Sequence, residues 1–198
     1  MMTFSVYRWS VQACSIFLGL LFWTAGMSKL YHQHAFIGFM GPQWLIEKLA
    51  EFQLGFYASF IAYCQVVIGL MLLTLRFRLL GAVFLVPMLA NILMITISQN
   101  WRGTPYVVSI FIAMNLWVLW IDRQKLLLFL GYVPQTIPAQ NTPIQKQLPA
   151  DALWLLGIVA NIISIQFSFI ALPFAYTLAV LGVIISFGAY QWHKKLTK

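Results

Sequence analysis

Long apolar runs separated by short polar stretches dominate the sequence. A helix that crosses the hydrocarbon core of a bilayer needs about 20 mostly apolar residues. Six segments approach that length: Trp9–Leu30, Gly55–Leu75, Leu79–Ser98, Tyr106–Ile121, Ala152–Ile170 and Pro173–Tyr190. The pattern therefore predicts an all-α integral membrane protein with six transmembrane helices.

Only Ala171 and Leu172 separate the last two segments, so one long kinked helix is an alternative to a hairpin. The basic residues discriminate, because lysine and arginine are in excess in cytoplasmic loops. With six helices and the N-terminus inside, the cytoplasmic set is Arg8, Arg76, Arg78, Arg123, Lys125, Lys146, Lys194, Lys195 and Lys198, and the external set is Lys29, Lys48 and Arg102. With five helices the last three lysines move outside, and the split becomes six against six. We therefore expect six helices with both termini in the cytoplasm.

The stretch from Gln43 to Gln53 is predicted to lie flat in the outer membrane interface. Four of its apolar residues recur at helical spacing on the side opposite to Glu47, Lys48 and Glu51; they are Leu45, Ile46, Leu49 and Phe52. A short helix with one apolar and one charged face is typical of segments that rest at the boundary between headgroups and acyl chains. We expect an interfacial helix over residues 43–53.

Prolines divide the chain after its fourth apolar segment. Residues 126–151 contain Pro134, Pro138, Pro143 and Pro149, and proline interrupts both helices and strands. This range is predicted to be a cytoplasmic linker. It would separate a four-helix membrane core over residues 1–125 from a C-terminal transmembrane hairpin with a basic tail over residues 152–198.

Composition supports a membrane protein and excludes two other classes. Only 8% of the residues are charged and 62% are hydrophobic, whereas a soluble domain carries about 25% charged residues. The net charge of +8 comes from basic residues scattered between apolar runs, not from the single basic face of a nucleic-acid binder. We expect membrane lipids and other membrane subunits as partners, and no nucleic acid.

The predicted spans carry amides and no ionisable residue at their centres. That absence argues against an ion-coupled pump with its own carboxylates and against haem held by two histidines. Counting about 1.5 Å of rise per residue from the helix ends places four amides near the bilayer midplane. They are Gln65, Asn91, Asn115 and Asn161. They are either hydrogen-bonding contacts between helices or a polar patch that binds the oxygens of a lipophilic ligand such as a quinone.

Two further patterns invite a functional reading. His32 and His34 follow the first predicted helix and form a weak candidate metal site, because a closed site needs further ligands. Small residues recur along the last predicted helix at spacings of four and three: Ala175, Ala179, Gly182, Ser186 and Ala189. Such a stripe lets a neighbouring helix approach closely. The neighbour is either the preceding helix or another subunit.

The first part of the chain contains a series of glycine, apolar and basic motifs: Arg8, Gly19–Phe22, Ala25–Leu30, Gly69–Leu70 and Arg76–Arg78. With these motifs, roughly residues 8–125 resemble the DoxX family of small bacterial membrane proteins. The resemblance implies a four-helix bundle in the bacterial cytoplasmic membrane, and the family's members include a subunit of a thiosulfate:quinone oxidoreductase. It also singles out Lys29 as a functional residue. The two helices after residue 151 depart from the family pattern, and the absence of a CxxC motif argues against thiol-oxidase chemistry.

These observations lead to three hypotheses of function. The first is a membrane subunit of a redox-related complex, which binds a quinone or another lipophilic ligand while its partners supply the redox centres. The second is a non-enzymatic partner that assembles or anchors other membrane proteins, and the third is a carrier for a lipophilic metabolite. The sequence contains no self-contained catalytic motif and predicts no intrinsic cofactor. Any catalysis would therefore belong to a quinone-linked oxidoreductase of which this chain is a subunit.

Overall fold

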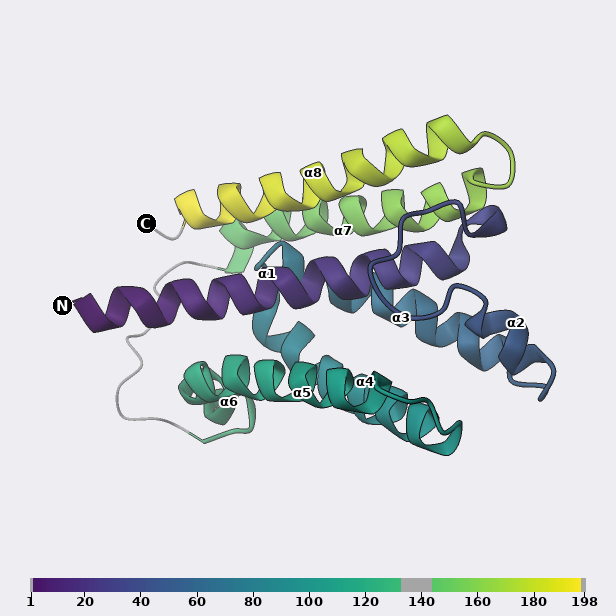
Figure 1. The fold of residues 1–198 in the computed structure, drawn as a ribbon. Coiled ribbons are helices and arrows are strands. Elements are labelled where there is room, and N and C mark those ends of the chain that lie inside the picture. The colour runs from purple at the N-terminus through teal and green to yellow at the C-terminus, as the bar shows by residue number, and fades with distance from the viewer. Residues whose placement is uncertain (1, 133–143, 197–198) are drawn as a thin grey trace. The chain divides into compact units, whose positions relative to one another are not determined.

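The computed structural model describes residues 2–132 and 144–196, and every regular element in those ranges is a helix (Figure 1). The long helices are α1 (Met2–Leu30), α3 (Gly55–Leu73), α4 (Arg78–Ser98), α5 (Thr104–Ile121), α7 (Ile144–Phe167) and α8 (Leu172–Leu196). The shorter elements are η1 (His32–His34), α2 (Leu45–Ala50) and α6 (Arg123–Phe129). The predicted all-α class is confirmed.

Six of the described helices are long and apolar enough to cross a membrane. They are the six that the apolar runs predict, with ends that differ by a few residues. The last two are separate: α7 ends at Phe167, a turn follows, and α8 begins at Leu172. Ser186 Oγ of α8 donates to the carbonyl of Trp154 in α7, while Gly182 of α8 lies against Gly157 of α7. Later residues of α8 thus lie beside earlier residues of α7, so the two helices are antiparallel. They form a hairpin and not one kinked helix.

The segments between the spans differ from the predictions in two places. The helix expected over residues 43–53 is only the single element α2, Leu45–Ala50. The predicted linker ends earlier than residue 151, because α7 already begins at Ile144 and contains Pro149. One proline removes one hydrogen bond of a helix and here does not end it. The other three prolines of the linker lie outside the described residues.

Contacts divide the chain into two compact units that do not follow the predicted boundary near residue 125. The first unit combines Met1–Leu18 with Met71–Ala139, and the second combines Gly19–Leu70 with Gln140–Lys198. Helices α1 and α3 therefore contribute to both units. The C-terminal hairpin belongs to the same unit as the second half of α1 and most of α3, so it is not a separate appendage.

In the first unit, α4 and α5 pack together and carry the polar contacts. Asn115 Nδ2 of α5 donates to the carbonyl of Ala82 in α4 over 2.9 Å. At the ends of these helices, the guanidinium of Arg78 donates to Asp122 Oδ2 through Nε, over 2.9 Å, and through Nη2. Asp122 is only 7% exposed. The partly buried cation Arg78 thus has a buried carboxylate partner.

In the second unit, small residues bring α7 and α8 into close contact. The predicted stripe of α8 is buried along its whole length: Ala175, Ala179, Gly182, Ser186 and Ala189. A Cβ atom added to Gly182 would lie 2.7 Å from the carbonyl oxygen of Gly157, which leaves no room for a side chain. The neighbour of the stripe is therefore α7 of the same chain.

Candidate functional site

Lys29 lies in the last turn of α1, yet its side chain is buried. Side chains on a helix lean toward its N-terminus, so a residue at the C-terminal end leans back over the preceding turn. The ammonium of Lys29 accordingly donates to the carbonyl of Ala25, one turn earlier, over 2.9 Å. Lys29 is only 8% exposed. The charge points back along the apolar span instead of out to the membrane surface.

Gln65 of α3 is the second partner of Lys29. Lys29 Nζ donates to Gln65 Oε1 over 3.2 Å, and Gln65 is buried as well. Two glycines make the contact possible by letting α1 and α3 approach closely. A Cβ atom on Gly26 would lie 2.6 Å from the carbonyl oxygen of Ala62, and one on Gly69 would collide with the backbone of Trp23. Both glycines belong to the motifs behind the DoxX resemblance.

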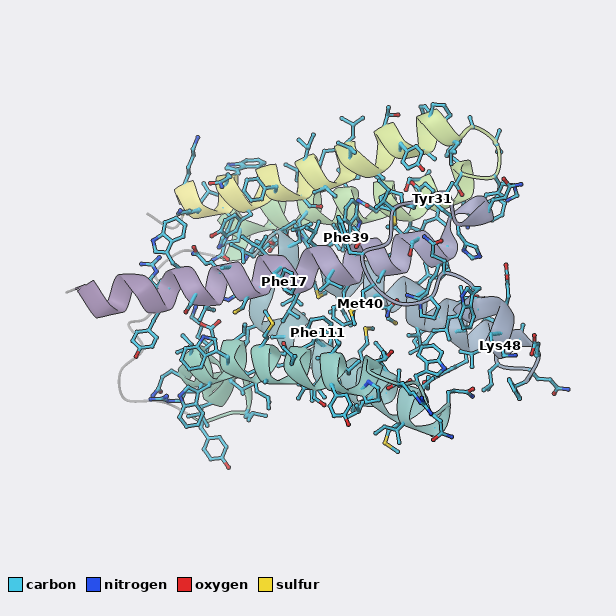
Figure 2. The ribbon with its side chains drawn as sticks, viewed as in Figure 1. Phe17, Tyr31, Phe39, Met40, Lys48 and Phe111 are labelled. Atoms are coloured by element: carbon cyan, nitrogen blue, oxygen red, sulfur yellow. The ribbon has the colours of Figure 1, made fainter. Side chains whose placement is uncertain are left out.

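The loop after α1 turns back along that helix (Figure 1), and its Gly41 lies beside Lys29. Figure 2 shows Tyr31 at the start of this loop and Phe39 and Met40 farther along it. The ring of Phe36 lies 5.5 Å from that of Trp23, so this loop packs against α1 about two turns before the end of the helix. We call residues 35–44 the covering loop.

Two glycines fit the covering loop against the end of α1. A Cβ atom on Gly38 would collide with the side chain of Ser28. Gly41 has a φ of +82°, in the left-handed region that glycine adopts without strain. A Cβ atom at this position would lie 3.4 Å from Lys29 Nζ. Gly41 is itself exposed, so the ammonium lies directly beneath an exposed residue that has no side chain.

His34 ties the two ends of the covering loop to each other. Its Nδ1 lies 3.2 Å from the carbonyl oxygen of Ser28, and its Nε2 lies 3.3 Å from Glu47 Oε1 on α2. Both neighbours are acceptors, so the ring satisfies both contacts when it carries two protons. The ring of His32 instead lies 5.1 Å from that of Phe169. The two histidines thus have separate neighbours, and the described residues contain no group of three or more His, Cys, Asp or Glu that could hold a metal ion.

The hydrogen-bond partners of Lys29 are neutral. An ammonium has three donors, and the two acceptors here are a backbone carbonyl and a side-chain amide, both neutral. The nearby acids have other partners, because Glu47 faces His34 and Glu51 pairs with Lys48. Among the described residues, no carboxylate forms an ion pair with Lys29. The positive charge is buried without a counter-ion.

Asn161 of α7 has both ends of its amide engaged elsewhere. Its Oδ1 accepts from Trp23 Nε1 over 2.9 Å, and its Nδ2 donates to the carbonyl of Gly157 over 2.9 Å. This network links α1 to the hairpin. The structure therefore favours the interhelical reading for Asn161 over a role in ligand binding.

The remaining two amides belong to the first unit. Asn115 has its Nδ2 on Ala82, while its buried Oδ1 has no partner within the described ranges. Asn91 lies half-buried on α4. Of the five residues singled out as ligand-binding candidates, Lys29 and Gln65 form a hydrogen bond with each other.

Sequence reasoning missed the burial of Lys29 and the role of the covering loop. The lean of side chains toward a helix N-terminus and the pair Gly38 and Gly41 were the available signals. It also missed Tyr31, whose hydroxyl lies 3.0 Å from Ser164 Oγ and 3.1 Å from the carbonyl oxygen of Ala175. Burial raises the pKa of the Tyr31 phenol, so the phenol stays protonated and donates. Tyr31 thereby ties the start of the loop to the hairpin.

Comparison with known proteins found no match among protein-family models, curated proteins or solved structures. The function of the chain is therefore inferred from the residues of the site.

Proposed function

We propose that this chain is the membrane subunit of a redox-related complex and binds the head group of a quinone, or of another lipophilic ligand with oxygen acceptors, at Lys29 and Gln65. The observation that carries the proposal is the buried ammonium of Lys29 without a counter-ion. Ionisable residues at membrane depth are costly to bury and therefore mark functional sites. A structural lysine at a helix end would extend to the interface instead.

The two side chains offer donors that suit such a ligand. Lys29 can donate to a ligand oxygen, and the amide Nε2 of Gln65 forms no hydrogen bond with the described residues. A quinone carbonyl accepts hydrogen bonds, and its hydroxyl form also donates them. The site positions a head group without transferring electrons, so partner subunits would supply the redox centres.

The DoxX resemblance agrees with this proposal. Gly26, Lys29 and Gly69 belong to its motifs, and in this fold the two glycines set the distance between Lys29 and Gln65. We extend the proposal to the bacterial cytoplasmic membrane, with both termini inside and Lys29 toward the outer side. This orientation follows from the distribution of basic residues.

The hypothesis of an assembly partner loses its main motive. It relied on the small-residue stripe of α8 as a surface for another subunit, and α7 occupies that stripe. The carrier hypothesis gains no observation either. Ligand binding at Lys29 is the hypothesis with a specific structural basis.

The test is to purify the protein with its native partners and measure the quinone it retains. Three samples are compared: the natural chain, Lys29→Met and Lys48→Met. Lys48 is a matched control, because it is an exposed lysine on α2, paired with Glu51 (Figure 2). We expect quinone in the natural chain and the control and a loss in Lys29→Met. Equal quinone content in the natural chain and Lys29→Met, or none in any sample, would contradict the proposal.

A further inference from the structure

The donors of Lys29 outnumber its acceptors. Nζ carries three hydrogens, and the described residues supply the carbonyl of Ala25 and Oε1 of Gln65. Both acceptors are dipoles, which solvate a cation without neutralising it. Unlike Arg78, which pairs with Asp122, Lys29 has no carboxylate partner among the described residues.

The missing component is an anion and not merely another acceptor. A neutral carbonyl would complete the hydrogen bonds of Nζ and leave the charge uncompensated. An anionic oxygen would do both, and hydrogen bonds between charged groups are about twice as strong as neutral ones. The difference is largest in a low-dielectric setting, where an unpaired charge is most costly.

The covering loop brings an exposed residue without a side chain close to the ammonium. Gly41 is exposed, and a carbon atom attached to it would be 3.4 Å from Nζ. An anion at this position would therefore lie within reach of Lys29. His34, which directly precedes the covering loop, is engaged with Ser28 and Glu47.

We infer that the ligand bound at Lys29 carries a negative charge on a head-group oxygen, as an ionised hydroxyquinone or a lipophilic carboxylate does. The inference rests on the proposed function and narrows it from oxygen acceptors in general to anionic ones. An anionic phospholipid shares this chemistry and is separated from it below.

A matched pair of ligands tests the inference. A 2-hydroxy-3-alkyl-1,4-naphthoquinone is ionised at neutral pH, whereas its 2-methoxy ether is neutral and nearly the same size. Binding of each is measured to the natural chain and to Lys29→Met in nanodiscs of phosphatidylcholine. We expect the hydroxy compound to bind the natural chain at least about tenfold more tightly, a difference of about 1.4 kcal/mol, and this preference to vanish in Lys29→Met. Repeating the measurement with phosphatidylglycerol present identifies an anionic lipid as the occupant if the lipid competes with the hydroxy compound.

A second pair of variants introduces a side chain of the protein itself beside Lys29 Nζ. Asparagine and aspartate both tolerate the left-handed backbone of Gly41 better than other side chains do. Gly41→Asp places a carboxylate beside Lys29 Nζ, while Gly41→Asn places a neutral amide there. We expect the preference for the hydroxy compound to disappear in Gly41→Asp and to persist in Gly41→Asn.

The outcomes separate the two claims. If neither naphthoquinone binds the natural chain, the proposed function fails. If both bind equally well, the proposed function stands and the inference of an anionic ligand is overturned. The same holds if Gly41→Asp keeps the preference that Gly41→Asn shows. The Lys29→Met result decides the matter even if Gly41→Asp does not fold.

Discussion

Arg78 and Lys29 are cations near helix ends, and they differ in what surrounds them. Arg78 opens α4 in the first unit, is partly buried, and binds Asp122 through two nitrogens, with Lys125 also 3.7 Å from the same carboxylate. Lys29 closes α1 in the second unit, is buried, and donates to a carbonyl and an amide. A carboxylate thus neutralises the charge of Arg78, whereas no carboxylate in the described part of the chain pairs with Lys29.

Under the proposed function, this difference separates a charge that stabilises the fold from one that binds a ligand. A buried ion pair with its partner in place costs the fold little, whereas a buried charge without a partner is strongly destabilising. The chain has only four acidic residues, and one of them forms an ion pair with Arg78. In the described part of the chain, none forms an ion pair with Lys29. Under the proposal made above, a ligand completes the site of Lys29. The four predictions that follow test this contrast in order of expected effect.

Removing the acid of the structural pair should have the largest effect on stability. Asp122→Asn leaves the guanidinium of Arg78 without a counter-ion, which should lower the free energy of unfolding by about 3 kcal/mol. The measurement is thermal unfolding in detergent. Glu51→Gln is the control, because the pair of Glu51 with exposed Lys48 is worth about 0–1 kcal/mol. Equal destabilisation by the two changes would show that Arg78 does not depend on Asp122.

Introducing a carboxylate beside Lys29 should weaken the binding of an anionic ligand. Gln65→Glu keeps the shape of the side chain and provides the counter-ion that Lys29 lacks. An anionic ligand then competes with an internal carboxylate, and its affinity should fall by about tenfold, or about 1.4 kcal/mol. Titration with the hydroxynaphthoquinone measures the change. An affinity equal to that of the natural chain would mean that the charge of Lys29 does not drive binding.

Removing the functional charge should not harm the unliganded fold. Lys29→Met replaces the buried ammonium with an apolar chain of similar length, so the unliganded protein should keep its stability or gain about 1 kcal/mol. Thermal unfolding with and without ligand is the measurement. A ligand should raise the melting temperature of the natural chain but not of the variant. Strong destabilisation without ligand would instead make Lys29 a structural residue.

A hydrogen bond of the interhelical network should have the smallest effect. Trp23→Phe removes the donor to Asn161 Oδ1, and such bonds within membranes are worth about 0.6 kcal/mol on average. The stability should fall by that amount, and the affinity for ligand should not change. A large loss of affinity, measured by the same titration, would return Asn161 to the list of ligand-binding residues.

The helices were predictable because each span is a long apolar run whose length alone identifies it. The hairpin was predictable from the distribution of basic residues, which favours six spans over five. The interfacial helix was predicted too long. Its helical spacing does not show where hydrogen bonding stops, and only Leu45–Ala50 is helical.

The site was predictable in its residues but not in its geometry. Lys29 was singled out by the DoxX resemblance, and Gln65 by its predicted depth in the membrane. The helical rise per residue predicts how deep a residue lies but not the direction in which its side chain points. The depth argument therefore gave Asn161 and Gln65 equal weight, although Trp23 engages one and Lys29 the other. The covering loop follows from tertiary contacts of Gly38, Gly41 and Phe36, which have no helical or strand period to reveal them.

The most direct test follows the Lys29 ammonium itself. Protein labelled with ¹⁵N at the lysine side chains is placed in nanodiscs, and the Lys29 signal is identified by its absence in Lys29→Met. Adding the hydroxynaphthoquinone should shift this signal and leave that of Lys48 unchanged. If the ligand binds and the Lys29 signal does not move, the ammonium is not the binding group and the central claim is wrong.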